Sequence, residues 1–223
     1  FFFLLRNNKT EISQVIVDLC AQRLPKAYGY SAFDNIQVLC PSKKGELGTA
    51  EMNFRLQKAL NPKSADKAEI EIASKTFRIG DKVMQIKNNY DIVWKDKLGK
   101  SGMGVYNGDI GTIVEIDTAS EYLKVDYEDK IALYGFEMLN ELEHAWALTV
   151  HKSQGSEYRA VILSLNPVAQ MLLTRGVLYT AVTRAKELLI MVGDDNVAHR
   201  MIDNHKQSRR YSALRIRLAD ENT

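Results

Sequence analysis

Polar and charged side chains gather in the segment 149–157, directly after an apolar run that is typical of a strand. The segment reads Thr149-Val-His-Lys-Ser-Gln-Gly-Ser-Glu157. Thr149 or Ser153 can cap a following helical turn, and Gly155 allows a sharp turn of the backbone. Such a turn exposes N–H groups that attract anions. Further donors come from His151, Lys152, Ser153 and Gln154. Taken alone, the pattern favours an ordinary polar connection between strand and helix, and the alternative is a site for a phosphate of nucleotide or nucleic acid.

A single arginine is the second candidate for chemistry. Arg184 lies in Leu178-Tyr-Thr-Ala-Val-Thr-Arg-Ala-Lys186, and the apolar spacing predicts a helix over 171–185 that is packed on both sides. Arg184 would occupy the last turn, where a cation complements the helix dipole, which is a structural role. The alternative is an arginine finger, whose planar guanidinium stabilises charge on a γ-phosphate held by a neighbouring domain.

The elements that must position these residues follow from the hydrophobic periodicity. An amphipathic helix is expected over 11–23, ended by Pro25, then a strand over 36–40 and a helix near 49–60. From about Lys75 closely spaced β-prone runs with turns replace this pattern. After Glu143 it returns, with strands over 145–150, 160–165 and 188–192 and helices over 171–185 and 196–204.

This order predicts an α/β fold with a parallel sheet, interrupted by a small five-stranded β-barrel. The α/β domain would comprise 1–74 and 140–223, and the inserted barrel 75–139. The first residues already have strand character, which suggests that the chain is a piece of a longer protein.

Composition restricts the class of protein. The 223 residues are 45% hydrophobic, enough for a proper core, and no apolar run is long enough for a membrane span or an export signal. Cys20 and Cys40 lie in apolar stretches, so we expect buried thiols and a cytoplasmic location. The net charge of +2 means that any basic track must be local. The arginines after Gln207 favour a solvated terminal helix over a DNA-binding one.

Several other motifs are weak. Gly99-Lys100-Ser101 is not a phosphate-binding loop, because Trp94 stands where that motif requires a glycine, and we expect a turn between barrel strands. His199, Asp203 and His205 are interpreted as helix-surface residues rather than a metal site, so we assign no metal. No motif of a hydrolase or nuclease centre is evident.

Four segments in order resemble the RecD-like group of superfamily 1 helicases, the exodeoxyribonuclease V alpha subunit family. Segments 147–158 and 178–186 resemble motifs V and VI, and Val38-Leu-Cys-Pro-Ser-Lys-Lys-Gly45 with 52–62 resembles the motif IV region. The run 77–90, followed by 105–113, is similar to the SH3-like barrel inserted in the second motor domain. The resemblance therefore implies a RecA-like second motor domain.

The resemblance also implies roles for individual residues. Arg184 would contact the γ-phosphate of ATP, and Gly155 and Glu157 would lie near its ribose and phosphates. Lys44 would be a second cation there, with Lys43 as the alternative. The residues expected at single-stranded DNA are Thr149, His151, Lys152 and Gln154, the last coupling the two ligands. On the barrel, a cationic and aromatic surface for DNA would consist of Lys82, Lys87, Tyr90 and Trp94, although such aromatic residues often belong to a barrel's own core.

The function implied is that of the C-terminal half of an ATP-dependent DNA helicase, moving 5′ to 3′ in DNA repair or recombination. ATP and Mg²⁺ would be held mainly by an N-terminal motor domain that precedes Phe1, so this piece alone should be inactive. Its partners would be single-stranded DNA, that N-terminal domain and other subunits of a nuclease–helicase complex. No membrane would be involved. Two alternatives remain: the helicase part of a conjugative relaxase, and a non-enzymatic nucleic-acid adaptor with a degenerate motor fold.

Overall fold

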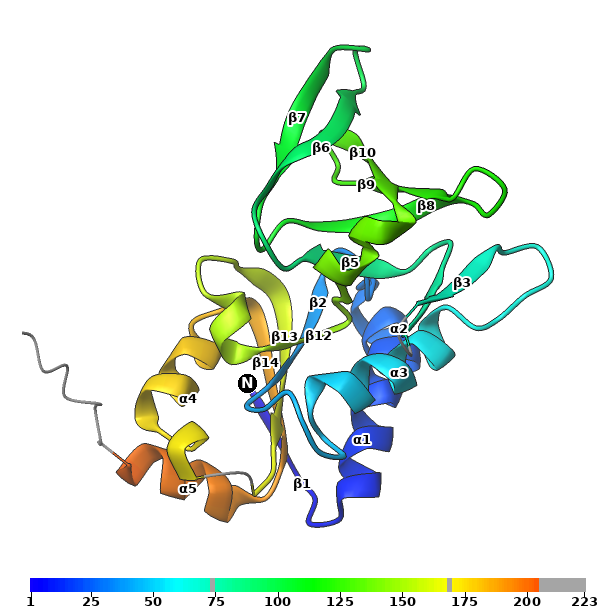
Figure 1. The fold of residues 1–223 in the computed structure, drawn as a ribbon. Helices are drawn as coiled ribbons and strands as arrows, with labels where there is room; N and C mark the ends of the chain where they lie inside the picture. The colour runs from blue at the N-terminus through cyan, green and yellow to red at the C-terminus, as the bar shows by residue number, and fades with distance from the viewer. Residues whose placement is uncertain (73–74, 168–169, 205–223) are drawn as a thin grey trace, which may run out of the picture.

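The computed structural model describes residues 1–72, 75–167 and 170–204. The strands in these ranges form a parallel sheet, a larger antiparallel sheet and a separate two-stranded pair (Figure 1). The parallel sheet has the order β1-β14-β13-β2-β12. Its strands are β1 (Phe2–Leu5), β2 (Ile36–Cys40), β12 (Ala147–Thr149), β13 (Tyr158–Leu165) and β14 (Ala185–Gly193). All their pairings are parallel, which confirms the predicted α/β class.

Helices cover both faces of the parallel sheet, so its central strands β2 and β13 are almost entirely buried and mostly apolar. On one face lie α1 (Lys9–Asp18) and α3 (Thr49–Leu60), which pack with Val38 and Ile162. On the other lie α4 (Arg175–Val182) and α5 (Asp195–Asp203), which pack with Leu39 and Leu163. Neighbouring residues of one strand therefore enter opposite cores, as the alternation of side chains along a strand requires. This three-layer arrangement is RecA-like.

The first helix does not end at Pro25, contrary to the sequence expectation. After α1 the chain makes a π-helical turn (Leu19–Arg23) and continues into α2 (Leu24–Tyr28). Pro25 stands in the first turn of α2, directly after the π-helical turn, so the helical path continues past the proline instead of ending at it. Helix α2 ends at Gly29, whose N–H donates to the Pro25 carbonyl at 2.9 Å.

The antiparallel sheet is a barrel-like insert above the parallel sheet (Figure 1), and it has seven strands rather than the five expected. Its order is β11-β5-β8-β9-β10-β6-β7. The strands are β5 (Lys82–Gln85), β6 (Asn89–Asp96), β7 (Ser101–Val105), β8 (Ile110–Asp117), β9 (Tyr122–Asp126), β10 (Lys130–Gly135) and β11 (Leu142–His144). A 3₁₀ helix (Phe136–Glu141) precedes β11, and β3 (Glu69–Ile72) pairs with β4 (Lys75–Arg78). The turn predicted at Gly99-Lys100-Ser101 is confirmed, because it joins β6 to β7.

Helix α4 is shorter and less buried than the spacing predicts. A 3₁₀ turn (Gln170–Leu172) precedes it, Thr174 caps it by accepting from the Val177 N–H, and it ends at Val182. Only one face is packed, because Tyr179 remains 69% exposed. Arg184 therefore lies beyond the helix, in the connection to β14, and not in its last turn.

Both cysteines are buried and unpaired, as expected, and burial raises the pKa of each thiol to about 12. Within the ranges that the structure describes, no helix combines the length and apolar character needed to cross a membrane. The predicted basic tail after Gln207, and His205, lie outside the described residues.

Lys82 is not on the barrel surface, contrary to the sequence expectation. Its side chain enters the junction between barrel and sheet, where Nζ donates to Oε1 of Gln37 at 3.3 Å and only 6% of the residue is exposed. Desolvation by burial lowers the pKa of Lys82 from 10.5 to about 8. Lys82 is therefore a structural residue rather than a DNA contact.

A measurable pH dependence follows for Lys82. The folded state holds this proton more weakly than the unfolded state, so the contribution of Lys82 to the free energy of unfolding rises between pH 8 and pH 10.5, by about 3 kcal/mol. We expect Lys82→Met to lose this rise, and Lys95→Met, at an exposed lysine of β6, to keep it. Urea unfolding of the 223-residue chain at several pH values measures the difference. An identical pH profile for Lys82→Met and the unaltered chain would contradict the assignment.

Candidate functional site

The segment after β12 forms the tight turn that its residues predict. A 3₁₀ helix (Val150–Ser153) follows β12, and Thr149 caps it by accepting from the Lys152 N–H at 3.4 Å. Ser153 does not cap; it is fully buried and its hydroxyl donates to the Val150 carbonyl at 2.8 Å. Gly155 has φ +87°, a left-handed conformation that strains other residues. Of the predicted ligand residues here, His151, Gln154, Gly155 and Glu157 are exposed and Lys152 is half-buried.

Arg184 lies beside the end of this segment. Its Nη1 donates to the Ser156 carbonyl at 2.9 Å and its Nε to the Thr180 carbonyl at 3.2 Å, while Nη2 donates to the Thr183 hydroxyl at 3.3 Å. The Tyr158 N–H in turn donates to the Arg184 carbonyl at 2.9 Å. The structure thus brings the predicted arginine finger next to residues 155–157, at a partly exposed edge of the sheet rather than in the core.

The site residues fall into two groups at opposite ends of the parallel strands. Thr149 ends β12 at its carboxyl end, level with Cys40 of β2. Arg184 and Glu157 immediately precede the amino ends of β14 and β13. Glu157 also pairs with Lys186, with Oε2 and Nζ 3.3 Å apart. The predicted nucleotide contacts Arg184 and Glu157 therefore lie at the other edge of the sheet from Thr149, joined to it by the 150–157 segment, whereas Lys44 follows the carboxyl end of β2 and is not grouped with them.

Lys43 and Lys152 share one carboxylate at the carboxyl edge. Glu143 accepts from Lys43 at Oε1 (2.5 Å) and from Lys152 at Oε2 (3.0 Å). The loop before α3 positions Lys43, because Gly48 approaches so closely that a Cβ there would lie 2.6 Å from the Lys43 carbonyl oxygen. Lys44 is exposed, and it is Lys43, not Lys44, that shares a carboxylate with Lys152 of the segment 149–153.

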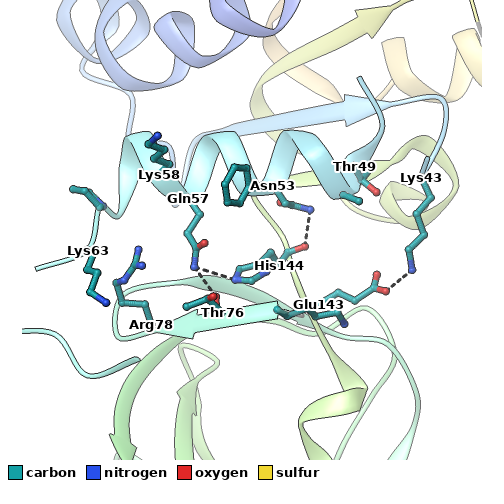
Figure 2. Close-up of a pocket in the computed structure, with 14 residues that line it drawn as sticks. Lys43, Thr49, Asn53, Gln57, Lys58, Lys63, Thr76, Arg78, Glu143 and His144 are labelled. Carbon is teal, nitrogen blue, oxygen red and sulfur yellow. Dashed lines mark hydrogen bonds and ion pairs between the residues drawn. The ribbon is translucent and has the colours of Figure 1, made fainter. Parts of the chain in front are cut away.

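A groove of about 630 Å³ lies between α3 and the strands that enter and leave the barrel (Figure 2). Six of its side chains are basic: Lys43, Lys58, Lys63, Lys75, Arg78 and His144. Glu143 is the one acid among the described residues that line it, although Glu69 beside it pairs with Lys63 and Arg78. Phe54 is 62% exposed along the groove. The net charge of the chain, +2, gives no sign of this local gathering of basic residues. The sequence analysis missed it because the six residues come from four separate segments.

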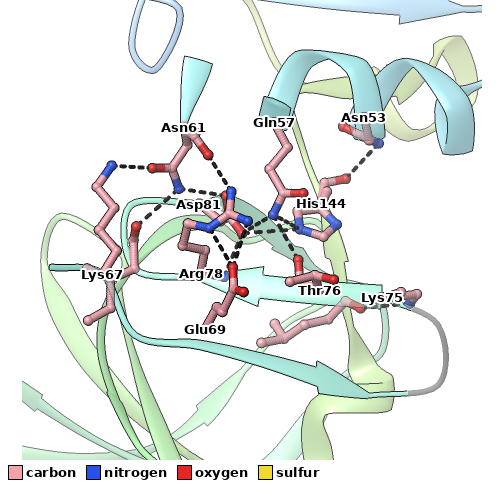
Figure 3. A network of polar contacts seen from close by, with 12 residues as sticks. Asn53, Gln57, Asn61, Lys67, Glu69, Lys75, Thr76, Arg78, Asp81 and His144 are labelled. Carbon is pink, nitrogen blue, oxygen red and sulfur yellow. Dashed lines mark hydrogen bonds and ion pairs between the residues drawn. The ribbon is translucent and has the colours of Figure 1, made fainter. Parts of the chain in front are cut away.

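The floor of the groove is a buried polar network that fastens α3 to the barrel (Figure 3). Asn53, Gln57 and Asn61 recur every fourth residue along α3 and are each at least 91% buried. Gln57 and Asn61 donate to opposite oxygens of Asp81, at 2.6 and 2.8 Å. Asn53 donates to the carbonyls of residues 144 and 147. The sequence analysis did not predict this junction, although the polar spacing at i, i+4 and i+8 is a signal from which it could have been found.

The barrel surface proposed from sequence is only partly present. Tyr90 is 65% exposed, but Lys87 pairs with Glu141 at 3.6 Å. Trp94 is half-buried against the barrel core, with the Lys130 ammonium 5.7 Å from its ring centre. Trp94 is therefore largely a structural residue, in agreement with the alternative that such aromatic residues belong to the barrel's own core.

The described residues contain no group of three or more His, Cys, Asp or Glu side chains arranged to hold a metal ion. His199, one of the residues considered for a metal, has its Nδ1 2.9 Å from the Asp195 carbonyl oxygen within α5. Glu157, which is the acid among the predicted nucleotide contacts, is already paired with Lys186.

The parallel sheet, the inserted barrel and an arginine beside the motif V segment together define the second motor domain of a helicase. Family models agree: residues 52–127 match the SH3 domain of ATP-dependent RecD-like DNA helicases, and residues 144–192 match the UvrD-like helicase C-terminal domain. The chain belongs to the RecD-like helicases of superfamily 1.

Individual relatives are similar over most of this chain. The ATP-dependent RecD2 DNA helicase of Deinococcus radiodurans is 35% identical over 71% of the chain, and the RecBCD enzyme subunit RecD of Mycolicibacterium smegmatis is 28% identical over 84%. The chain spans only 20% and 30% of the lengths of these two proteins. Among solved structures, the Pif1 helicase from Bacteroides in complex with ADP-AlF3 and ssDNA aligns with 96% of the chain and 50% of its own, at 17% identity and a TM-score of 0.48.

Proposed function

We propose that this chain is the second motor domain of an ATP-dependent DNA helicase that couples ATP hydrolysis to 5′ to 3′ movement along single-stranded DNA. Membership of the RecD-like family supports the reaction, and its direction rests on family resemblance. The observation that carries the proposal is the position of Arg184, whose guanidinium is held at the sheet edge by the Ser156 carbonyl.

At this edge the arginine would serve a nucleotide held mainly by a preceding motor domain. Bound ATP and Mg²⁺ would supply the γ-phosphate and its counter-charge. Arg184 presents a fixed cation, and Gly155 and Glu157 lie on the adjoining turn. The bonds from Arg184 to Thr180 and Thr183 hold the guanidinium plane before closure of the two domains, so little reorganisation is needed.

The opposite edge would hold the DNA backbone. Thr149, His151, Lys152 and Gln154 lie on the turn after β12, and the basic groove adjoins them through Lys43 and Glu143. A phosphate backbone suits clustered lysines, and the exposed Phe54 offers a ring on which a base can stack. Because segment 150–157 spans the two edges, a change at the nucleotide can bias the DNA contact through one short piece of chain.

His151→Ala in the full-length protein tests the DNA contact. We expect severalfold weaker binding of single-stranded DNA and a salt dependence that is shallower by up to about 0.7 in the slope of log K against log salt, as one phosphate contact is lost. His199→Ala, an exposed histidine on α5, is the control and should change neither quantity. An unaltered slope for His151→Ala argues against DNA at this turn. Failure of single-stranded DNA to stimulate ATP hydrolysis by the unaltered protein would refute the proposed function itself.

A further inference from the structure

Three lysines and one glutamate meet where the basic groove reaches the DNA-side turn. Lys43 from the loop before α3 and Lys152 from the turn after β12 both donate to Glu143 of β11 (Figure 2 shows the Lys43 contact). Lys75 of β4 lines the same groove and donates to the Leu142 carbonyl at 3.1 Å. The cluster therefore draws on four separate elements and carries a formal charge of +2.

The cluster is partly withdrawn from water. The side chains of Glu143 and Lys152 are 20% and 34% exposed. The pKa of Lys75 is lowered, chiefly by desolvation and further by the positive charges of Lys43 and Lys152. Desolvation by itself would raise the pKa of Glu143, but the hydrogen bonds and positive charges of Lys43 and Lys152 together outweigh it, so this pKa is lowered as well. One carboxylate thus pairs with two ammonium groups, and the nearby Lys75 ammonium bonds to a backbone carbonyl, so the positive charge of the cluster is only partly neutralised.

A carboxylate that accepts from two lysines has the charge and the acceptor geometry of a phosphate with two cationic partners. We propose that Glu143 occupies the position of a backbone phosphate in the DNA-free protein, and that a phosphate of single-stranded DNA displaces its side chain and takes over Lys43 and Lys152. The inference rests on the proposed function and extends it to this groove. A polyanion suits the site, because Lys58 also lines the groove, as does Lys63, which is 75% exposed at its side chain although paired with Glu69.

This arrangement gives Glu143 a regulatory role. Without DNA it keeps the two lysines in place and lowers the positive potential of the groove. With DNA it becomes a nearby negative charge that weakens the contact. Glu143 therefore limits how tightly the motor holds each phosphate, which favours release at every step over a static grip.

The test is single-stranded DNA binding by full-length Glu143→Gln as a function of salt. Glutamine keeps the shape and one acceptor of Glu143 but removes its charge. We expect binding about three- to tenfold tighter at low salt, with the slope of log K against log salt steeper by about 0.7, because the freed lysines neutralise more phosphate charge. Glu115→Gln is the matched control: it also removes an acid paired with a lysine, Lys124, but does not line the groove.

A double variant completes the experiment. Combining Glu143→Gln with Lys43→Gln should return affinity and slope toward those of the unaltered protein, because the lysine that gains from the first change is gone. Affinity equal to or weaker than that of Glu115→Gln would overturn the phosphate-mimic role while leaving the proposed function intact. If the unaltered protein does not bind single-stranded DNA, the proposed function fails instead. Circular dichroism of each variant verifies that it is folded.

Discussion

Arg184→Ala in the full-length protein should reduce DNA-stimulated ATP hydrolysis by at least about 1000-fold, the magnitude associated with loss of an arginine finger. Single-stranded DNA affinity should stay within about twofold, because Arg184 lies at the amino ends of the strands, away from Thr149 at the carboxyl edge. Steady-state turnover and equilibrium binding measure the two effects separately.

A structural role for Arg184 would give a different result. Its guanidinium donates to Ser156, Thr180 and Thr183, so the alanine variant also loses contacts that order the edge. Arg184→Lys separates the catalytic role from the structural one, because lysine keeps the charge but not the planar fork of the guanidinium. For a catalytic role, turnover of this variant should remain strongly reduced while its thermal stability changes little. Arg159→Ala, an exposed arginine of β13 paired with Glu187, is the control. Turnover of Arg184→Ala equal to that of the control would remove the finger assignment.

The second large effect is expected at the junction between α3 and the barrel. Asp81→Ala should lower the free energy of unfolding of the 223-residue chain by about 3 to 5 kcal/mol. Asp81 is fully buried and accepts from the side chains of Gln57 and Asn61 and from the Arg78 N–H, all within 2.8 Å. His144 Nε2 lies 3.3 Å from the same carboxyl group. Alanine would leave several buried donors without their strongest acceptor.

Urea unfolding measures this effect directly. Asp91→Ala, at an exposed position of β6, should change the free energy of unfolding by less than about 0.5 kcal/mol and controls for the loss of an aspartate. Because Trp94 packs in the barrel and Trp146 in the core of the parallel sheet, their fluorescence reports both parts. A loss below about 1 kcal/mol for Asp81→Ala would show that the network does not hold the junction.

Sequence reasoning identified the parallel strands because both faces of each are apolar. Cys40 and Leu163, for example, are fully buried within runs whose hydrophobic character is continuous. It predicted the turn at Gly99-Lys100-Ser101 but did not delimit β6 and β7 on either side of it, because these two strands have no such pattern. Gly102 of β7 stands where the Trp94 ring leaves no room for a Cβ, with the nearest ring atom 2.3 Å from its position. The requirement for glycine at this position comes from a contact between neighbouring strands, and local β-propensity does not reveal such a contact.

The amino-acid sequence by itself determined the family, the layered α/β class and the position of the turn at residues 149–157, because these depend on local periodicity and on residues adjacent in the chain. Only the tertiary structure decided that Lys82 is buried, that Arg184 reaches the Ser156 carbonyl, and that Lys43, Lys75 and Lys152 surround Glu143. These facts depend on which distant segments meet, and the free energy of such contacts arises from burial and charge proximity created by folding.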